Sequence, residues 1–178
     1  MSQEALWSPD PSESLGRVWG LDPSSVALAL GVYNGIHYAT TSCGLPRHPD
    51  PARRLAAALP VAEGWLEQCV TRYGKPVMVM VEQPAAHGHN VHPATWYATG
   101  MVMMAVAVTV DCPIMAITPT SWKASALGKG HGHASKSEVN AWAREQGWRG
   151  ASLDESDTCG IARCAYLRLA GYLKEQVT

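Results

Sequence analysis

Residues 17–43, RVWGLDPSSVALALGVYNGIHYATTSC, predict the first half of the fold. The stretch contains three short runs rich in apolar and β-branched residues, 17–21, 25–33 and 36–43. The pair Asp22-Pro23 ends the first run, because proline supplies no amide hydrogen to a strand ladder. The pair Asn34-Gly35 joins the second run to the third and is typical of a β-hairpin, because both residues tolerate positive φ. We therefore expect three consecutive antiparallel strands.

Beyond residue 43 the pattern changes to helices alternating with strands. From Asp50-Pro51 to Gly74, apolar residues recur at helical spacing. VMVMV at 77–81 is apolar throughout, which is typical of a strand covered by helices on both faces of a sheet. The elements expected after it are a helix over 93–110, a strand over 113–117 and helices that begin near 119, 135 and 152. The order βββαβαβααα predicts an α/β fold: a five-stranded mixed sheet, three antiparallel strands then two parallel ones, with helices on both faces.

Length and composition bound the class of protein. The chain has 178 residues, of which 47% are hydrophobic and 16% are charged, and this builds one core but not two. We expect a single domain over 17–178 after a disordered polar tail at 1–16. The net charge of -1 excludes a protein that is basic throughout, so any nucleic-acid surface has to be local.

Cysteine usage and hydropathy predict a soluble, cytoplasmic protein. The five cysteines are odd in number and form no C-x-x-C pair, which argues against a disulfide framework or a cysteine zinc site. The N-terminus lacks the basic and apolar regions of a signal peptide. The long apolar run at 100–110 ends at Asp111, well short of the ~18 residues of a membrane span. We therefore expect no association with membranes.

Two of the predicted strands end at a carboxylate that is followed by a turn containing proline. Asp22 precedes Pro23, and Glu82 precedes Gln83-Pro84. If the two strands are parallel neighbours, their ends lie about 4.8 Å apart at the sheet edge where α/β proteins bind ligands. A solvated acid also ends a strand without any function, so this pair alone leaves the interpretation open.

The last predicted helix adds two more acids. Asp154 and Asp157 continue the apolar stripe of that helix, so both are expected to face the sheet. The helix dipole alone would account for Asp154, but an acid such as Asp157 that faces a core costs several kcal/mol unless it is paired or binds a metal. Glu155 is explained by a capping box with Ser152. The prediction is a cluster of four carboxylates, Asp22, Glu82, Asp154 and Asp157.

Clustered carboxylates without cysteine favour Mg²⁺ or Mn²⁺ over zinc. Four of them can hold two ions about 3.5–4 Å apart. In such a pair one ion activates water and the other stabilises the leaving 3′ oxygen, which is the arrangement for in-line hydrolysis of a phosphodiester. The sequence therefore predicts a catalytic site with two Mg²⁺ ions, for which Mn²⁺ substitutes.

A locally basic segment lies between the second and third of these acids. Residues 112–137 contain no acid. They contain five side chains that we predict to contact DNA, Lys123, Lys129, Lys136, His131 and His133. Lys136 lies in the first turn of a predicted helix, where the dipole disfavours a cation, so an external phosphate explains it better than helix stability does. Lys123 is equally well explained as a solvated residue on a short helix.

These segments resemble the motifs of a known family. GLDPSS at 20–25, VMVMVEQP at 77–84 and DESDTCGIA at 154–162 look like the three acidic motifs of RuvC-type Holliday junction resolvases, whose fold is ribonuclease H-like. TPTSWKASALGKGHGHASKSEV at 118–139 is similar to the basic stretch between the second and third motifs. Each motif is weak alone, but all four occur in the family's order over nearly the whole predicted domain.

The resemblance implies a homodimer that binds branched DNA in the form of four-way junctions and nicks two strands symmetrically. It implies that the four acids bind the metal ions and that three lysines face the DNA backbone, Lys123, Lys129 and Lys136. The helix over 93–110 is apolar nearly all round, more than one face against a sheet can use. We therefore expect this helix to form part of the dimer contact, the alternative being a monomer in which the rest of the chain covers its second side.

The chain departs from the family pattern at Ala85, where such enzymes often carry a bulky aromatic residue thought to stack at the junction centre. If the junction-opening step is kept, another side chain has to carry it, such as His87, His89 or Trp96. Two alternatives remain open: another ribonuclease H-like nuclease, acting on branched DNA or RNA–DNA hybrids, and a branched-DNA-binding module without catalysis. The acidic motifs do not separate the nucleases, whereas a silent module would lack at least one of the four acids.

Overall fold

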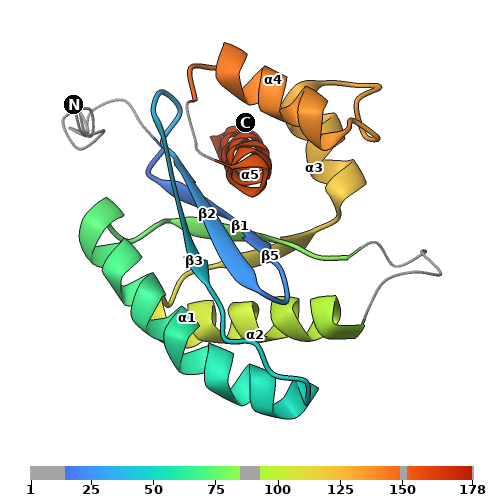
Figure 1. Cartoon of the computed structure of the whole chain (residues 1–178). Coiled ribbons are helices and arrows are strands. Elements are labelled where there is room, and N and C mark those ends of the chain that lie inside the picture. The colour runs from blue at the N-terminus through green and yellow to red at the C-terminus, as the bar shows by residue number, and fades with distance from the viewer. Residues whose placement is uncertain (1–14, 85–92, 149–151, 178) are drawn as a thin grey trace, which may run out of the picture.

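The computed structural model describes residues 15–84, 93–148 and 152–177. They form three layers, in which a β-sheet separates two groups of helices (Figure 1). The tail predicted at 1–16 lies almost entirely outside these residues. Within the described ranges, no helix is both long and apolar enough to cross a membrane.

The described residues form a sheet of five strands in the order β3-β2-β1-β4-β5. The strands are β1 (Val18–Pro23), β2 (Ala27–Tyr33), β3 (Tyr38–Gly44), β4 (Met78–Glu82) and β5 (Ile114–Ile117). β1, β2 and β3 pair in antiparallel fashion, and β4 and β5 continue the sheet in parallel with β1. The predicted mixed sheet of three antiparallel strands followed by two parallel ones is confirmed.

The turn between β2 and β3 forms where Asn34-Gly35 predicted it. The side-chain Oδ1 of Asn34 accepts hydrogen bonds from the backbone amides of Ile36, at 3.1 Å, and His37, at 2.8 Å. Gly35 has φ of +97°, a conformation that costs glycine little. β3 begins at Tyr38, two residues later than predicted, because the asparagine turn uses those residues.

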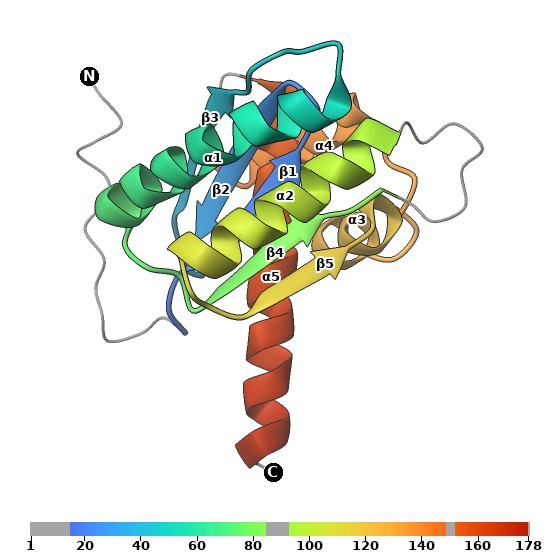
Figure 2. The ribbon, with the colours of Figure 1, turned by 90° about the horizontal axis from the view of Figure 1, so that it is seen from below.

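Helices cover both faces of the sheet, as predicted. One face carries α1 (Pro51–Tyr73) and α2 (Pro93–Thr109), which lie side by side in Figure 2. The other face carries the long α5 (Leu153–Val177), with α3 (Pro119–Leu127) and α4 (Lys136–Glu145) packed against it. α1 starts where Asp50 accepts hydrogen bonds from the amides of Ala52 and Arg53, so the cap predicted from Asp50-Pro51 is present.

Alternation along β1 divides the core into two halves. Trp19 and Leu21 point toward α1 and α2, where they are fully buried. Val18 points to the opposite side and packs in the core beneath α5. Because side chains alternate along a strand, Gly20 and Asp22 also belong to the α5 face. The sheet therefore presents Asp22 to the helix that carries the last two predicted acids.

A pair of glycines lets α5 lie directly on the sheet. Gly20 of β1 and Gly31 of β2 are opposite each other in the ladder. A Cβ atom at Gly31 would lie 2.5 Å from the carbonyl oxygen of Thr158, and one at Gly20 would lie 2.4 Å from the amide nitrogen of Ala162. Only glycine leaves room for this approach, which brings the first turns of α5 close to the end of β1.

Candidate active site

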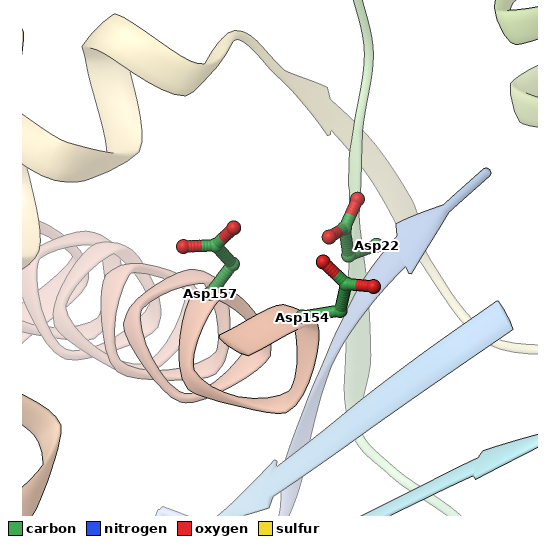
Figure 3. Close-up of side chains that lie close together, drawn as sticks. All are labelled: Asp22, Asp154 and Asp157. Carbon is green, nitrogen blue, oxygen red and sulfur yellow. The ribbon is translucent and has the colours of Figure 1, made fainter. Parts of the chain in front are cut away.

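Three acids from two distant segments meet at the edge of the sheet. Asp22 lies near the end of β1, while Asp154 and Asp157 lie in the first turns of α5. Figure 3 shows Asp154 beside Asp22, with Asp157 projecting from the next turn of the helix. Each of the three offers a carboxylate oxygen, and these oxygens all lie within 4.8 Å of one another. The close approach predicted for these three residues is therefore present.

The acids line a pocket of about 150 Å³, together with Glu82, Lys136 and the β1–β2 turn. Glu82 is the last residue of β4, which is parallel to β1. Because Leu21 is opposite Val81 in that ladder, Asp22 and Glu82 come next along the two neighbouring strands. The predicted meeting of two strand ends thus occurs, although Glu82 lies outside the group of three acids whose oxygens are mutually close.

Glu82 has a partner of its own. The indole Nε1 of Trp122, in α3, donates a hydrogen bond of 2.5 Å to Oε2 of Glu82. Trp122 is fully buried. The bond to the carboxylate was not expected, because 40 residues separate the two side chains and no local pattern connects them.

Burial and like charge disfavour the ionised forms of Asp22, Glu82 and Asp157. Burial raises the pKa of Asp22 well above its usual value, and the nearby carboxylates of Glu82 and Asp157 raise it further. Burial raises the pKa of Glu82 to about 7, although the Trp122 hydrogen bond acts in the opposite direction. Burial also raises the pKa of Asp157, against the opposing effect of Lys136. A cation in the pocket would relieve this repulsion.

Asp157 shows that the pocket suits a cation. Its Oδ1 atom is buried and has no hydrogen-bond partner among the described residues. A buried carboxylate oxygen without a partner is costly, and a metal ion removes the cost. The donor set is made of carboxylate oxygens from acidic side chains, which are the ligands that Mg²⁺ and Mn²⁺ prefer.

Lys136 lies at the same pocket and pairs with two of its acids. Its Nζ atom is 2.5 Å from Oδ1 of Asp154 and 3.5 Å from Oδ2 of Asp157. Burial lowers the pKa of Lys136, but the hydrogen bond to Asp154 and the charges of the acids outweigh this and raise it. The acids of α5 therefore account for a lysine at this helix start without an external phosphate, and the contact of Lys136 with DNA stays a prediction.

The other predicted DNA-binding residues do not line the pocket. Lys123 donates a 2.7 Å hydrogen bond from Nζ to the carbonyl oxygen of Ala134, so it fastens α3 to the following loop as well as carrying charge. Lys129, His131 and His133 are exposed between α3 and α4. The structure thus places three of these side chains at the surface, and Lys136 at the acids.

Glu155 has a larger role than the predicted capping box. Its amide donates to Oγ of Ser152 at 3.2 Å, which is the expected first half of the box. Its carboxylate, however, accepts hydrogen bonds from the hydroxyls of Thr40 and Ser42 on β3. Trp148 donates to the same Thr40 hydroxyl from Nε1 at 3.2 Å. The buried Glu155 therefore fastens the start of α5 to the edge strand, a contact that sequence reasoning missed.

The departure at Ala85 falls outside the described residues, together with His87 and His89. Trp96, the remaining candidate for the missing aromatic, lies in the first turn of α2 and is 42% exposed. Its place at the start of that helix follows directly after the segment that holds the departure.

Comparison with known proteins links the fold to one family. A curated relative, the crossover junction endodeoxyribonuclease RuvC of Nocardia farcinica, is 31% identical over 159 residues, which covers 83% of this chain and 79% of the relative. No family model matches the chain.

Solved structures agree with the ribonuclease H-like fold. The structure of Thermus thermophilus RuvC superposes with a TM-score of 0.63 at 24% identity, covering 87% of this chain and 96% of that one. The same protein in complex with a Holliday junction substrate gives 0.65 at 24% identity, covering 88% and 96%. The yeast mitochondrial Holliday junction resolvase Ydc2 gives 0.54 at 15% identity, covering 93% and 83%. The predicted fold is confirmed.

Proposed function

The chain belongs to the RuvC family of crossover junction endodeoxyribonucleases, and on that premise we propose that its metal-binding, catalytic residues are the four acids of the pocket, Asp22, Glu82, Asp154 and Asp157. As a member of this family it is a Holliday junction resolvase, an endonuclease of DNA recombination and repair. The observation that carries the proposal is that carboxylate oxygens of Asp22, Asp154 and Asp157 lie within 4.8 Å of one another.

The donor set fits two Mg²⁺ ions, with Mn²⁺ as a substitute. Four carboxylates balance the charge of two divalent ions, and Oδ1 of Asp157 lacks a partner among the described residues. When bound, such ions lower the pKa of an attacking water and stabilise the leaving 3′ oxygen of a phosphodiester. Asp22, from the sheet, and Asp154 and Asp157, from α5, would hold the ions between the two layers.

Lys136 changes partner in this scheme. Without metal, its ammonium group balances part of the charge of Asp154 and Asp157. If divalent cations were held by those carboxylates, the 52% exposed Lys136 side chain would be available to pair with the DNA backbone. The same residue thus stabilises the metal-free pocket and contacts the substrate, which keeps its predicted role in DNA binding.

The exposed segment between α3 and α4 would extend this contact. Lys129, His131 and His133 are all at the surface, and the hydrogen bond from Lys123 to Ala134 holds the segment against α3. We propose that these side chains follow the phosphate backbone of the branched DNA away from the pocket. Such contacts add affinity and position the substrate, without reading its sequence.

We further propose a two-fold homodimer in which α2 forms part of the interface. The face of α2 that points away from the core carries four exposed large hydrophobic residues, Trp96, Tyr97, Met104 and Val108. Val108 is 71% exposed, and a stripe of this kind is typical of a protein contact. A dimer would place two acidic pockets on one assembly, so that two strands of a junction are nicked symmetrically.

Light scattering at micromolar concentration tests the dimer. The expected mass is that of two chains, and Val108→Glu should shift it to one chain because it buries a charge in the interface. Val77→Glu, at a 43% exposed residue before β4, is the matched control and should leave the mass unchanged. A wild-type monomer that nicks junctions symmetrically would overturn the dimer but not the metal chemistry.

A panel of labelled substrates tests the function itself. The protein is incubated in Mg²⁺ with a four-way junction, a Y-shaped DNA, a linear duplex and an RNA–DNA hybrid. Cleavage concentrated on the four-way junction is the expected result. Preferential cleavage of the hybrid would favour the alternative ribonuclease H-like activity, and junction binding without any cleavage would favour the silent DNA-binding module.

A further inference from the structure

Trp122 makes a contact that the mechanism above does not use. Its side chain is fully buried, and its Nε1 atom donates to Oε2 of Glu82 at 2.5 Å. An indole nitrogen is only a donor, so it cannot exchange roles with the carboxylate. The bond therefore holds Oε2 of Glu82 toward α3, whereas Oε1 takes no part in it.

The position of the indole ring is itself fixed by α5. A Cβ atom at Gly160 would lie 2.3 Å from Cζ3 of the Trp122 ring, so the ring rests against the backbone of that helix. Gly160 lies one turn beyond Asp157 on the same helix. The ring thus connects the carboxylate at the end of β4 to the helix that carries the acids.

We propose that Trp122 is a positioning residue for metal binding: it holds Glu82 through Oε2, so that Glu82 meets a metal ion through Oε1 alone. The inference rests on the proposed role of Glu82 as a metal ligand. Held by the indole, the carboxylate binds with one oxygen and a defined direction. Without the indole, the Glu82 side chain is free to rotate, and ordering it on metal binding reduces the affinity for the ion.

A structural role for the bond is the alternative, because a buried indole N–H usually finds an acceptor. Trp19 argues against a general need for one in this protein. Its side chain is also fully buried, yet its Nε1 has no hydrogen-bond partner among the described residues. The buried indole of Trp19 is therefore tolerated without an acceptor among the described residues, whereas the buried indole of Trp122 donates to an acid of the pocket.

The test measures Mn²⁺ affinity by calorimetry, with no DNA present. Trp122→Phe keeps a ring and removes the donor, and we expect Mn²⁺ to bind at least fivefold more weakly than to the wild type. Trp19→Phe is the matched control, since it makes the same change in another buried indole, and it should stay within twofold. In a Glu82→Gln background, Trp122→Phe should have less than a twofold effect, because the carboxylate through which it acts is gone.

A second variant covers the case in which Trp122→Phe does not fold. Gly160→Ala keeps the indole but displaces the ring, and should weaken Mn²⁺ binding at least threefold. Gly171→Ala is its control, since a Cβ atom there meets nothing within 4 Å. Wild-type affinity in the folded Trp122→Phe protein would overturn the proposal, as would an equal loss in the Glu82→Gln background. If Trp122→Phe cannot be folded, wild-type affinity in Gly160→Ala overturns it.

Failure here is distinguishable from failure of the proposed function. Wild-type protein that binds Mn²⁺ but leaves all branched DNA intact would contradict the nuclease, whatever Trp122 does. Wild-type protein that cleaves junctions, beside a Trp122→Phe protein with unchanged Mn²⁺ affinity, would contradict the positioning role alone.

Discussion

Replacing Gly31 by alanine tests how α5 is brought to the acids. The new Cβ atom would lie 2.5 Å from the carbonyl oxygen of Thr158, and because that atom belongs to the helix backbone it cannot rotate away. An ordinary contact begins at 3.4 Å, so α5 has to move by roughly 1 Å from β2. Asp154 and Asp157 move with it, while Asp22 stays on the sheet.

The magnitude follows from two opposing effects. Overpacking a core costs about 1–3 kcal/mol, and a rigid backbone neighbour places this change toward the upper end. Alanine regains about 0.5–1 kcal/mol over glycine within a strand. The expected net loss is about 1–2 kcal/mol, which for a chain of this length lowers the melting temperature by roughly 2–8 °C. A 1 Å displacement of catalytic groups reduces the cleavage rate by up to about 100-fold.

Thermal unfolding by circular dichroism and single-turnover cleavage measure the two effects. Gly44→Ala is the matched control, because it makes the same change at the end of β3, where a Cβ atom meets nothing within 4 Å. It should leave both measurements close to wild type. If Gly31→Ala and Gly44→Ala have the same melting temperature and the same rate, then the glycine pair does not set the position of α5.

Three further predictions concern the acids. Asp22→Asn should abolish cleavage but keep or improve binding to branched DNA in a gel-shift assay, because it removes a ligand and a negative charge; cleavage at the wild-type rate would disprove its role. Glu155→Gln should cost about 1–2 kcal/mol of unfolding free energy, since it weakens the bonds to Thr40 and Ser42, and should reduce cleavage far less than Asp22→Asn does; equal losses would make Glu155 a ligand. In EDTA, the melting temperature should fall as the pH rises from 5 to 8, because the folded-state pKa of Glu82, about 7, lies above its unfolded value. The contribution of Glu82 to stability, up to about 3 kcal/mol, is therefore lost as the pH rises through that window. Saturating Mn²⁺ should remove the fall, and a melting temperature independent of pH in EDTA would refute it.

Local patterns predicted those parts of the fold that local physics determines. The turn at Asn34-Gly35 depends on those two residues alone, and a run of apolar residues such as 77–81 is enough to indicate a strand buried on both faces. Both predictions are confirmed. The close approach at Gly20 and Gly31 had no comparable signal. A glycine in a strand does not reveal which helix will lie against it.

In the site, too, local patterns predicted the acids but not the contacts between different elements. Asp154 and Asp157 were predicted because helical spacing places them on the apolar stripe that must face the sheet, and they do meet Asp22. The partners of Lys136 and Glu155 were missed for a different reason. A capping motif or a helix dipole describes one helix by itself, whereas these side chains bond to residues on another element.

Cleavage of a four-way junction by the wild-type protein, with labels on all four strands, in Mg²⁺ and in EDTA, tests the metal-dependent dimer most directly. A homodimer with a metal site in each subunit makes paired nicks at symmetric positions on two opposed strands in Mg²⁺, each leaving a 3′ hydroxyl, and leaves the junction intact in EDTA. Nicks of the same yield in EDTA, or an intact but bound junction in both Mg²⁺ and Mn²⁺, would contradict this mechanism.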